Sequence, residues 1–128
     1  MTFFKMSDLN KNNADNNTPL GGGAASPSLI YNITTQVLWG VHEMWLAWML
    51  DDHIPQILGT GCFVKHQVVR LMEADETEGP VYAVQYYLQD KSQYDTYLAL
   101  YQPAFKQQEY NKWGEKIFSF SSLMQVVH

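Results

Sequence analysis

Cysteine is almost absent from this sequence: its 128 residues contain one, Cys62. A single thiol excludes a disulfide within the chain and is typical of a protein that works in a reducing compartment. We therefore expect a cytoplasmic protein. Cys62 itself is more simply explained as a small buried hydrophobic residue than as a nucleophile.

Basic residues are also few, with 8 Lys and Arg against 13 Asp and Glu, and the formal net charge is −5. The charged residues before Ser28 cancel one another, so the excess negative charge falls on the rest of the chain. Binding to nucleic-acid phosphates needs a basic face, and so does electrostatic attachment to anionic lipid. The charge balance therefore argues against a nucleic-acid partner and against a membrane partner.

Long apolar runs are missing as well. Each run is interrupted by His, Glu, Asp or Gln, so no segment resembles a membrane span, and the first residues lack the apolar stretch of a secretory signal. The sequence has no Gly-rich phosphate loop and no nucleophile elbow. His42 and His53 would lie about 16 Å apart along a helix, too far to share a metal. We expect neither a cofactor nor a metal.

The composition divides the chain into two parts. Residues 1–27 are rich in Asn and end in a Gly-Gly-Gly-Ala-Ala-Ser-Pro stretch, which offers little apolar surface to offset the entropy lost on ordering. They predict a flexible leader and linker. Residues 28–128 have the length and apolar content of one globular domain.

Hydrophobic periodicity defines the first elements of this domain. Residues Leu29–Trp39 are rich in Ile, Thr and Val and predict a strand. Residues Val41–Asp51 have helical spacing, which places Met44, Trp45 and Asp52 on the same side. The apolar arc of this helix is wide, so we expect it to contact a sheet and a second element.

Proline and glycine mark the boundaries that follow. Pro55 disfavours helical geometry at the residue before it, so we expect the helix to break near His53. The ranges Cys62–Glu73 and Pro80–Gln89 then predict two strands of an antiparallel hairpin around an acidic turn at residues 74–79.

A second helix and a last strand complete the domain. Ser92 followed three residues later by Asp95 resembles a capping box and predicts a helix start. Pro103 should kink or divide this helix, and Gly114 should end it. The range Lys116–Val127 predicts the fourth strand.

The resulting order is βαββαβ. Right-handed crossovers place the first and third strands at the centre of the sheet and both helices on one face, which is a ferredoxin-like α+β fold with a four-stranded antiparallel sheet. The second face of this sheet is left open, and its character is mixed. We therefore expect a homodimer whose sheets face each other. The residues expected on the open face are Asn32, Thr34, Gln36, Ala83, Gln85 and Tyr87.

An ordered series of short motifs resembles a known family. The series comprises Ile30-Tyr31-Asn32-Ile33-Thr34, His42-Glu43-x-Trp45-Leu46-x-Trp48-Met49, His53-Ile54-Pro55, Gly61-x-Phe63 and Tyr82-x-Val84-Gln85-Tyr86. It is similar to an uncharacterised family of short bacterial domains of unknown function. The resemblance implies a dimeric α/β barrel, a superfamily that includes monooxygenases, isomerases and haem proteins, and it implies no particular reaction.

Two hypotheses for function remain open. In the first, the chain is a non-catalytic dimeric interaction module, and its aromatic residues are core. In the second, it is a dimeric enzyme or sensor with a small apolar pocket for a hydrophobic small molecule between helices and sheet. The candidate pocket residues are Trp45, Trp48, Met49, His53 and Tyr82.

His53 is the only candidate for a catalytic group, as a general base near neutral pH. The alternative is a histidine at a helix C-terminus, where the helix dipole favours the charged ring and raises its pKa. We expect the raised pKa.

Overall fold

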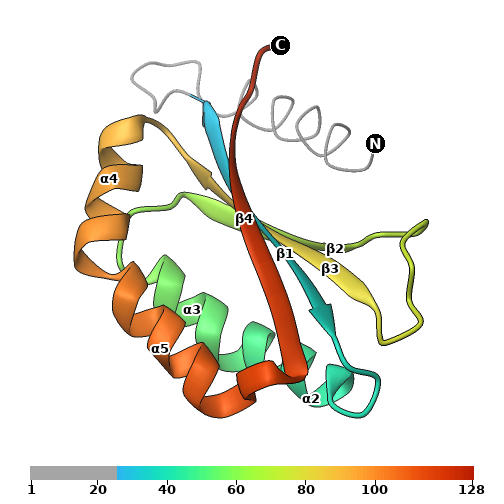
Figure 1. The fold of residues 1–128 in the computed structure, drawn as a ribbon. Helices are drawn as coiled ribbons and strands as arrows, with labels where there is room; N and C mark the ends of the chain where they lie inside the picture. Colours follow the sequence, from blue (N-terminus) through green and yellow to red (C-terminus); the bar gives the residue numbers. More distant parts are fainter. Residues whose placement is uncertain (1–25) are drawn as a thin grey trace.

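The computed structural model describes residues 26–128, so the predicted leader at residues 1–27 lies outside the described residues except for its last two. Figure 1 shows the path of the chain. The elements are, in order, β1 (Leu29–Val37), α2 (His42–Trp48), the π-helical turn η1 (Met49–His53), α3 (Ile54–Leu58), β2 (Lys65–Arg70), β3 (Val81–Leu88), α4 (Lys91–Leu100), α5 (Gln102–Trp113), the 3-10 turn η2 (Gly114–Lys116) and β4 (Ile117–Gln125).

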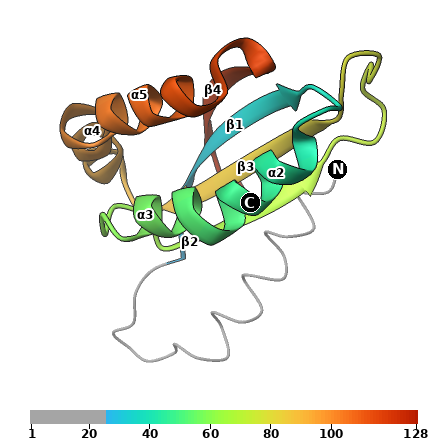
Figure 2. The same cartoon turned by 90° about the horizontal axis from the view of Figure 1, so that it is seen from below.

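The four strands form one antiparallel sheet in the order β2-β3-β1-β4. β1 and β3 are therefore central, as the crossover rule predicts. Figures 1 and 2 show the helices of residues 26–128 gathered on one face of this sheet, and none of them covers the other face, which we call the open face. The fold is ferredoxin-like α+β, and this prediction is confirmed.

Alternation along the two central strands sorts their side chains between the faces. Tyr31 and Val37 of β1, and Tyr86 and Leu88 of β3, point to the helices and belong to one buried cluster. The residues predicted for the open face occupy the intervening positions of the same strands. The core thus lies between sheet and helices.

The first helix does not break near His53, and that prediction is wrong. The helix continues through η1 into α3, with Pro55 in the first turn of α3. Trp45, Met49, His53 and Ile57 are all buried at intervals of four residues. Three turns of a regular α-helix take about 10.8 residues, but Ile57 lies twelve residues after Trp45. The π turn has more residues per turn than an α-helix, so it accommodates the extra residue and keeps all four side chains on one face.

A second error concerns Met44 and Asp52, which were expected on the apolar side of the helix but are both exposed. Met44 lies before the π turn, so the turn accounts for the exposure of Asp52 alone. The π turn rotates the following residues relative to a regular helix, so Met49 and His53 face the core while Asp52 faces solvent. In this position the Asp52 carboxylate accepts a hydrogen bond from the Gln56 side chain at 2.9 Å.

The second helix is divided, as Pro103 predicts: α4 ends at Leu100 and α5 begins at Gln102. The predicted capping box at Ser92 is wrong. Asp90 is the N-cap, and its carboxylate accepts hydrogen bonds from the Gln93 backbone N–H at 3.1 Å and from the Ser92 hydroxyl at 2.6 Å. A carboxylate has more acceptor capacity than a hydroxyl, so it takes the cap and Ser92 becomes a donor to it.

No helix within residues 26–128 is long and apolar enough to cross a membrane.

Candidate functional site

Two regions of the domain concentrate polar side chains in unusual surroundings. The first lies on the helix side of the sheet, around His53. The His53 ring is 3% exposed, stacks on the half-buried Trp48 ring with centroids 4.4 Å apart, and meets the edge of Phe105 at 5.6 Å. A histidine enclosed by two aromatic rings is held rigidly and kept away from water.

Glu109 on α5 is the acidic neighbour of this histidine. Its Oε2 lies 3.7 Å from His53 Nε2. Burial lowers the pKa of His53 to about 4 and raises the pKa of Glu109 to about 7. Both shifts favour the uncharged forms, because desolvation penalises a charge on either group. The pair therefore keeps its single proton on the carboxyl group in weakly acidic solution.

Sequence reasoning missed Glu109, although a signal was present. Phe105, Glu109 and Trp113 follow one another at intervals of four residues along α5, so they share a face of the helix. A carboxylate between two aromatic positions of one face indicates a buried acidic group. The partner residue, 56 positions earlier in the chain, could not be read from this pattern.

The expectation of a raised His53 pKa is wrong. A helix dipole acts on groups at the helix end, but the helical backbone runs on through His53 into α3. The residue also faces the interior instead of solvent. Desolvation is therefore the dominant cause, and it lowers the pKa.

Several buried donors and acceptors lack a hydrogen-bond partner within the described part of the chain. Four of them belong to aromatic or imidazole rings on the helix side, and one belongs to an amide on the open face. Each such group costs about 1–3 kcal/mol unless something satisfies it. These atoms are Trp45 Nε1, His53 Nδ1, Tyr86 OH, Trp113 Nε1 and Gln85 Oε1.

The predicted pocket residues comprise two ring pairs and Met49, which belongs to the same core cluster as Trp45 and Tyr82. Trp45 packs on Tyr82 with centroids 5.4 Å apart, and the Tyr82 hydroxyl lies 3.4 Å from His42 Nδ1. Trp48 pairs with His53, as described above, and Met49 is buried. A pocket formed by these five residues stays a prediction. Four of them, all except Trp48, are as buried as ordinary core side chains.

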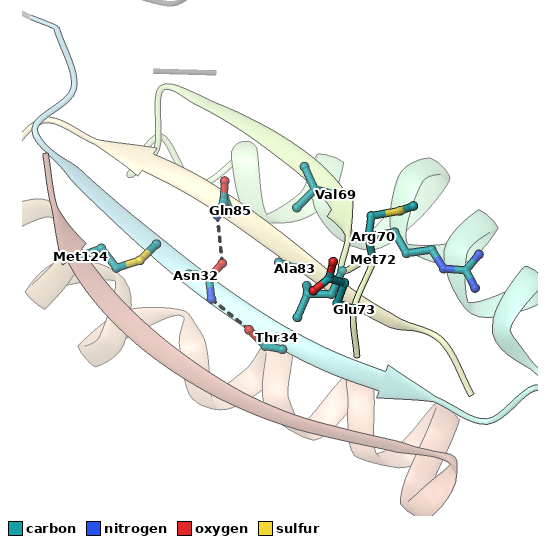
Figure 3. A pocket seen from close by; sticks show the side chains of 10 residues that line it. Asn32, Thr34, Val69, Arg70, Met72, Glu73, Ala83, Gln85 and Met124 are labelled. Atoms are coloured by element: carbon teal, nitrogen blue, oxygen red, sulfur yellow. Dashed lines mark hydrogen bonds between the residues drawn. The ribbon is translucent and has the colours of Figure 1, made fainter. Parts of the chain in front are cut away.

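The second region is a groove on the open face of the sheet (Figure 3). Its volume is about 590 Å³. We call it the sheet-face groove, and its lining residues are Asn32, Thr34, Val69, Arg70, Leu71, Met72, Glu73, Ala83, Gln85 and Met124. The groove combines a polar floor with walls that are mostly apolar but include the charged residues Arg70 and Glu73.

Three side chains of this floor form a hydrogen-bonded chain. Gln85 Nε2 donates to Asn32 Oδ1 at 3.2 Å, and Asn32 Nδ2 donates to Thr34 Oγ1 at 3.0 Å, as the dashed lines in Figure 3 mark. Gln85 is 2% exposed, and its Oε1 is the acceptor left without a partner among the described residues. The chain of amides fixes the floor in one geometry but leaves one acceptor free.

Two large aromatic side chains flank this floor on β4. Phe118 is 74% exposed and Phe120 is 59% exposed. Phe120 is paired directly with Thr34, and Phe118 with Gln36, so both project from the open face. We call these two residues the aromatic pair. Sequence reasoning overlooked them, although the alternation from Phe118 to Ser119 to Phe120 was visible.

In the described part of the chain, no three His, Cys, Asp or Glu side chains converge as metal ligands would.

Comparison with known proteins places this fold in a class. One similar solved structure is SnoaB, a cofactor-independent oxygenase from Streptomyces nogalater, with 15% identity and a TM-score of 0.59 over 79% of this chain and 95% of that one. Another is an ethyl tert-butyl ether d (ethd) family protein from Bacillus halodurans, with 11% identity and a TM-score of 0.57 over 77% of this chain and 99% of that one. A third is a monooxygenase from Streptomyces coelicolor in complex with the ligand Nanaomycin D, with 8% identity and a TM-score of 0.57 over 80% of this chain and 89% of that one. Identities this low establish the shared ferredoxin-like fold alone.

The family is established by sequence. Residues 28–127 match the family described as Domain of unknown function (DUF4286), so the chain belongs to that family. The resemblance seen in the motifs is confirmed. No curated protein matches the chain.

Proposed function

We propose that this chain is a bacterial, cytoplasmic interaction module that acts as a homodimer through the open face of its sheet. The proposal is based mainly on the exposure of the aromatic pair, Phe118 and Phe120, on the face opposite the helices of residues 26–128. Exposed apolar side chains gathered on one face are typical of association surfaces. The single cysteine supports the cytoplasmic assignment.

The chemistry of the open face also supports association. Its floor is neutral, because Asn32, Thr34, Gln85 and Ala83 carry no charge, and three of the four already hydrogen-bond one another. Asn32, Ala83 and Gln85 are already buried in the monomer, so association over this floor costs little further desolvation. Stable interfaces bury about 800 Å² on each partner, which is the scale of one face of a small sheet.

Light scattering at micromolar concentration tests the proposal. The native chain should have twice the mass of its 14.7 kDa monomer. Replacing both Phe118 and Phe120 with Asp should give monomers, because two charges would be buried without partners. The matched control is Leu100→Asp, since Leu100 is 68% exposed on α4, away from the sheet face, and should leave the dimer intact. A native chain that is monomeric at this concentration contradicts the proposal.

A second function is favoured by the helix-side region. We propose, as the alternative, that a hydrophobic small molecule binds between helices and sheet beside Trp48 and His53. Buried Nδ1 of His53 and the hydroxyl of Tyr86 are polar atoms that a ligand could satisfy. The names of two structural relatives, an oxygenase and a monooxygenase bound to Nanaomycin D, agree with small-molecule chemistry in this fold.

Native mass spectrometry of the purified protein tests this alternative. A co-purified organic molecule should appear as added mass on the native chain. It should be lost from a His53→Phe variant, which keeps the ring volume but removes the unpaired nitrogen. Added mass that persists in this variant, or a native chain of bare mass that also fails to bind the probe 2-naphthol in calorimetry, contradicts a site at His53.

A further inference from the structure

One wall of the sheet-face groove is formed by the loop that joins β2 to β3, residues 71–80. The first three residues of this loop, Leu71, Met72 and Glu73, line the groove. Met124 of β4 lines its other side, across the width of the two central strands (Figure 3). The groove is therefore a hollow with a hydrogen-bonded floor and a wall on each side.

Polar contacts hold the loop wall in place. Gln36 Nε2 on β1 donates to the carbonyls of Asp75 and Gly79, each at 3.0 Å. Trp39, which follows β1, donates from Nε1 to the carbonyl of Glu76 at 3.0 Å. These donors tie the loop to the end of a central strand. The wall is thus formed before any ligand arrives, and a preorganised site loses less conformational entropy on binding.

The charges at the groove do not balance. The guanidinium of Arg70 is paired with Glu76, at 2.8 Å from Nη2 to Oε1, and it points away from the groove in Figure 3. In the same view the Glu73 carboxylate lies among the lining side chains. Within residues 26–128, Glu73 makes no ion pair and no side-chain hydrogen bond. The groove therefore presents one uncompensated negative charge.

This charge discriminates between classes of ligand. Glu73 would repel an anion, and a neutral apolar molecule would cover the carboxylate without replacing its hydration. A cation would instead form a charge-assisted hydrogen bond with it. The remaining walls suit an apolar body, because the flexible thioether side chains of Met72 and Met124 adapt to irregular shapes. The volume of about 590 Å³ is typical of pockets that bind small molecules.

We propose that the sheet-face groove binds a small monocationic amine, with the ammonium group on the Glu73 carboxylate and the apolar part between Met72 and Met124. All of these residues belong to one chain, so the site does not depend on the proposed homodimer. In a dimer formed through the open face, the amine would be enclosed between the two copies and would neutralise a carboxylate that is otherwise buried alone.

Nuclear magnetic resonance of ¹³C-labelled methionine methyl groups tests the site, with hexylammonium at neutral pH as the probe. The methyl signals of Met72 and Met124 should shift on titration. The signal of Met44, which is exposed on α2, should not. 1-Hexanol has the same alkyl chain without the charge, and it should bind about tenfold more weakly or worse, because it cannot form the charge-assisted hydrogen bond.

A pair of variants tests the role of the carboxylate. Glu73→Gln keeps the shape of the side chain and removes its charge, so it should weaken hexylammonium binding by about tenfold or more. Glu78→Gln is the matched control, because it changes the net charge equally in the same loop, but Glu78 does not line the groove. This control should bind hexylammonium as the native chain does. Equal weakening by the two variants would show attraction to the net charge alone and would overturn the assignment to Glu73.

The outcomes are distinct from those for the homodimer, which light scattering decides. A native chain in which hexylammonium shifts neither Met72 nor Met124 overturns the amine site, whether that chain is a dimer or a monomer. Equal affinities for hexylammonium and 1-hexanol also overturn it, because the groove would then select an apolar body without regard to charge. This comparison uses the native chain, so it holds even if a variant fails to fold.

Discussion

The His53–Glu109 pair is the clearest case in this domain of burial overriding the ordinary chemistry of two residues. Separately, a histidine and a glutamate 3.7 Å apart would be expected to form an ion pair. In this interior each charged group would lose its hydration and gain few new hydrogen bonds, because the neighbouring side chains are aromatic rings. Desolvation is the first cause of both pKa shifts, and it acts in opposite directions on an acid and a base.

These shifts predict opposing pH dependences of stability. Unfolded His53 titrates near pH 6.5 and folded His53 near 4, so the unfolded state binds more protons in that window and acidification destabilises the fold. Glu109 titrates near 4.5 when unfolded and near 7 when folded, so its contribution is full below 4.5 and is lost as the pH rises through 7. In the native chain the two dependences largely cancel between pH 4.5 and 6.5.

Removing one partner should expose the dependence of the other. Glu109→Gln, which keeps the shape of the side chain, should lose about 3 kcal/mol of unfolding free energy between pH 6.5 and 4. His53→Gln should show the reverse slope and lose stability from pH 4.5 to 7. Urea unfolding at each pH measures both. A Glu109→Gln variant whose stability is flat over this range would show that His53 is not held neutral by burial.

At the scale of elements, backbone contacts at the ends of the strands constrain the sheet. The chain before β3 runs alongside the end of β1: Trp39 N–H donates to the Glu78 carbonyl at 3.1 Å, and Val37 N–H donates to the Pro80 carbonyl at 3.0 Å. Gly79 lies between these two bonds and is buried. A Cβ at this position would stand 2.7 Å from the carbonyl carbon of Val37, closer than real Cβ atoms approach.

Gly79→Ala should therefore be strongly destabilising. The colliding atoms are backbone, which cannot move without breaking the pairing of β1 with its neighbours, and we expect a loss of about 2 kcal/mol or more. Gly40→Ala is the matched control, because a Cβ there meets nothing within 4 Å and should be nearly neutral. Thermal unfolding followed by circular dichroism compares them, and equal melting temperatures for the two variants would refute the close approach.

At the scale of the whole molecule, the hydrogen bonds of Ser28 tie together one end of the sheet. Its backbone N–H donates to the Leu88 carbonyl, its hydroxyl donates to the Gln89 carbonyl at 2.6 Å, and its carbonyl accepts from Val126. Ser28 thus joins the start of β1 to the ends of both neighbouring strands. Ser28 is also the first residue of the family match.

A chain that starts at Ser28 should unfold within a few degrees of the full chain, because residues 1–27 offer little apolar surface for packing. A chain that starts at Ile30 is the control and should melt lower, since it lacks the hydrogen bonds of Ser28. Differential scanning calorimetry of the three chains makes the comparison. A drop for the Ser28 chain as large as that for the Ile30 chain would show that the first 27 residues pack on the domain.

Local rules determined the order of elements, the central position of β1 and β3, the division of the second helix at Pro103 and the family, because periodicity and turn chemistry act over a few residues. Only the tertiary structure decided which residues from distant segments of the chain are in contact. It extended the first helix through a π turn, since burial of Ile57 outweighs the preference of Pro55 for a break. It brought Glu109 to His53 and set the aromatic pair beside the sheet-face groove, because packing and sheet register act between residues that are far apart in the chain.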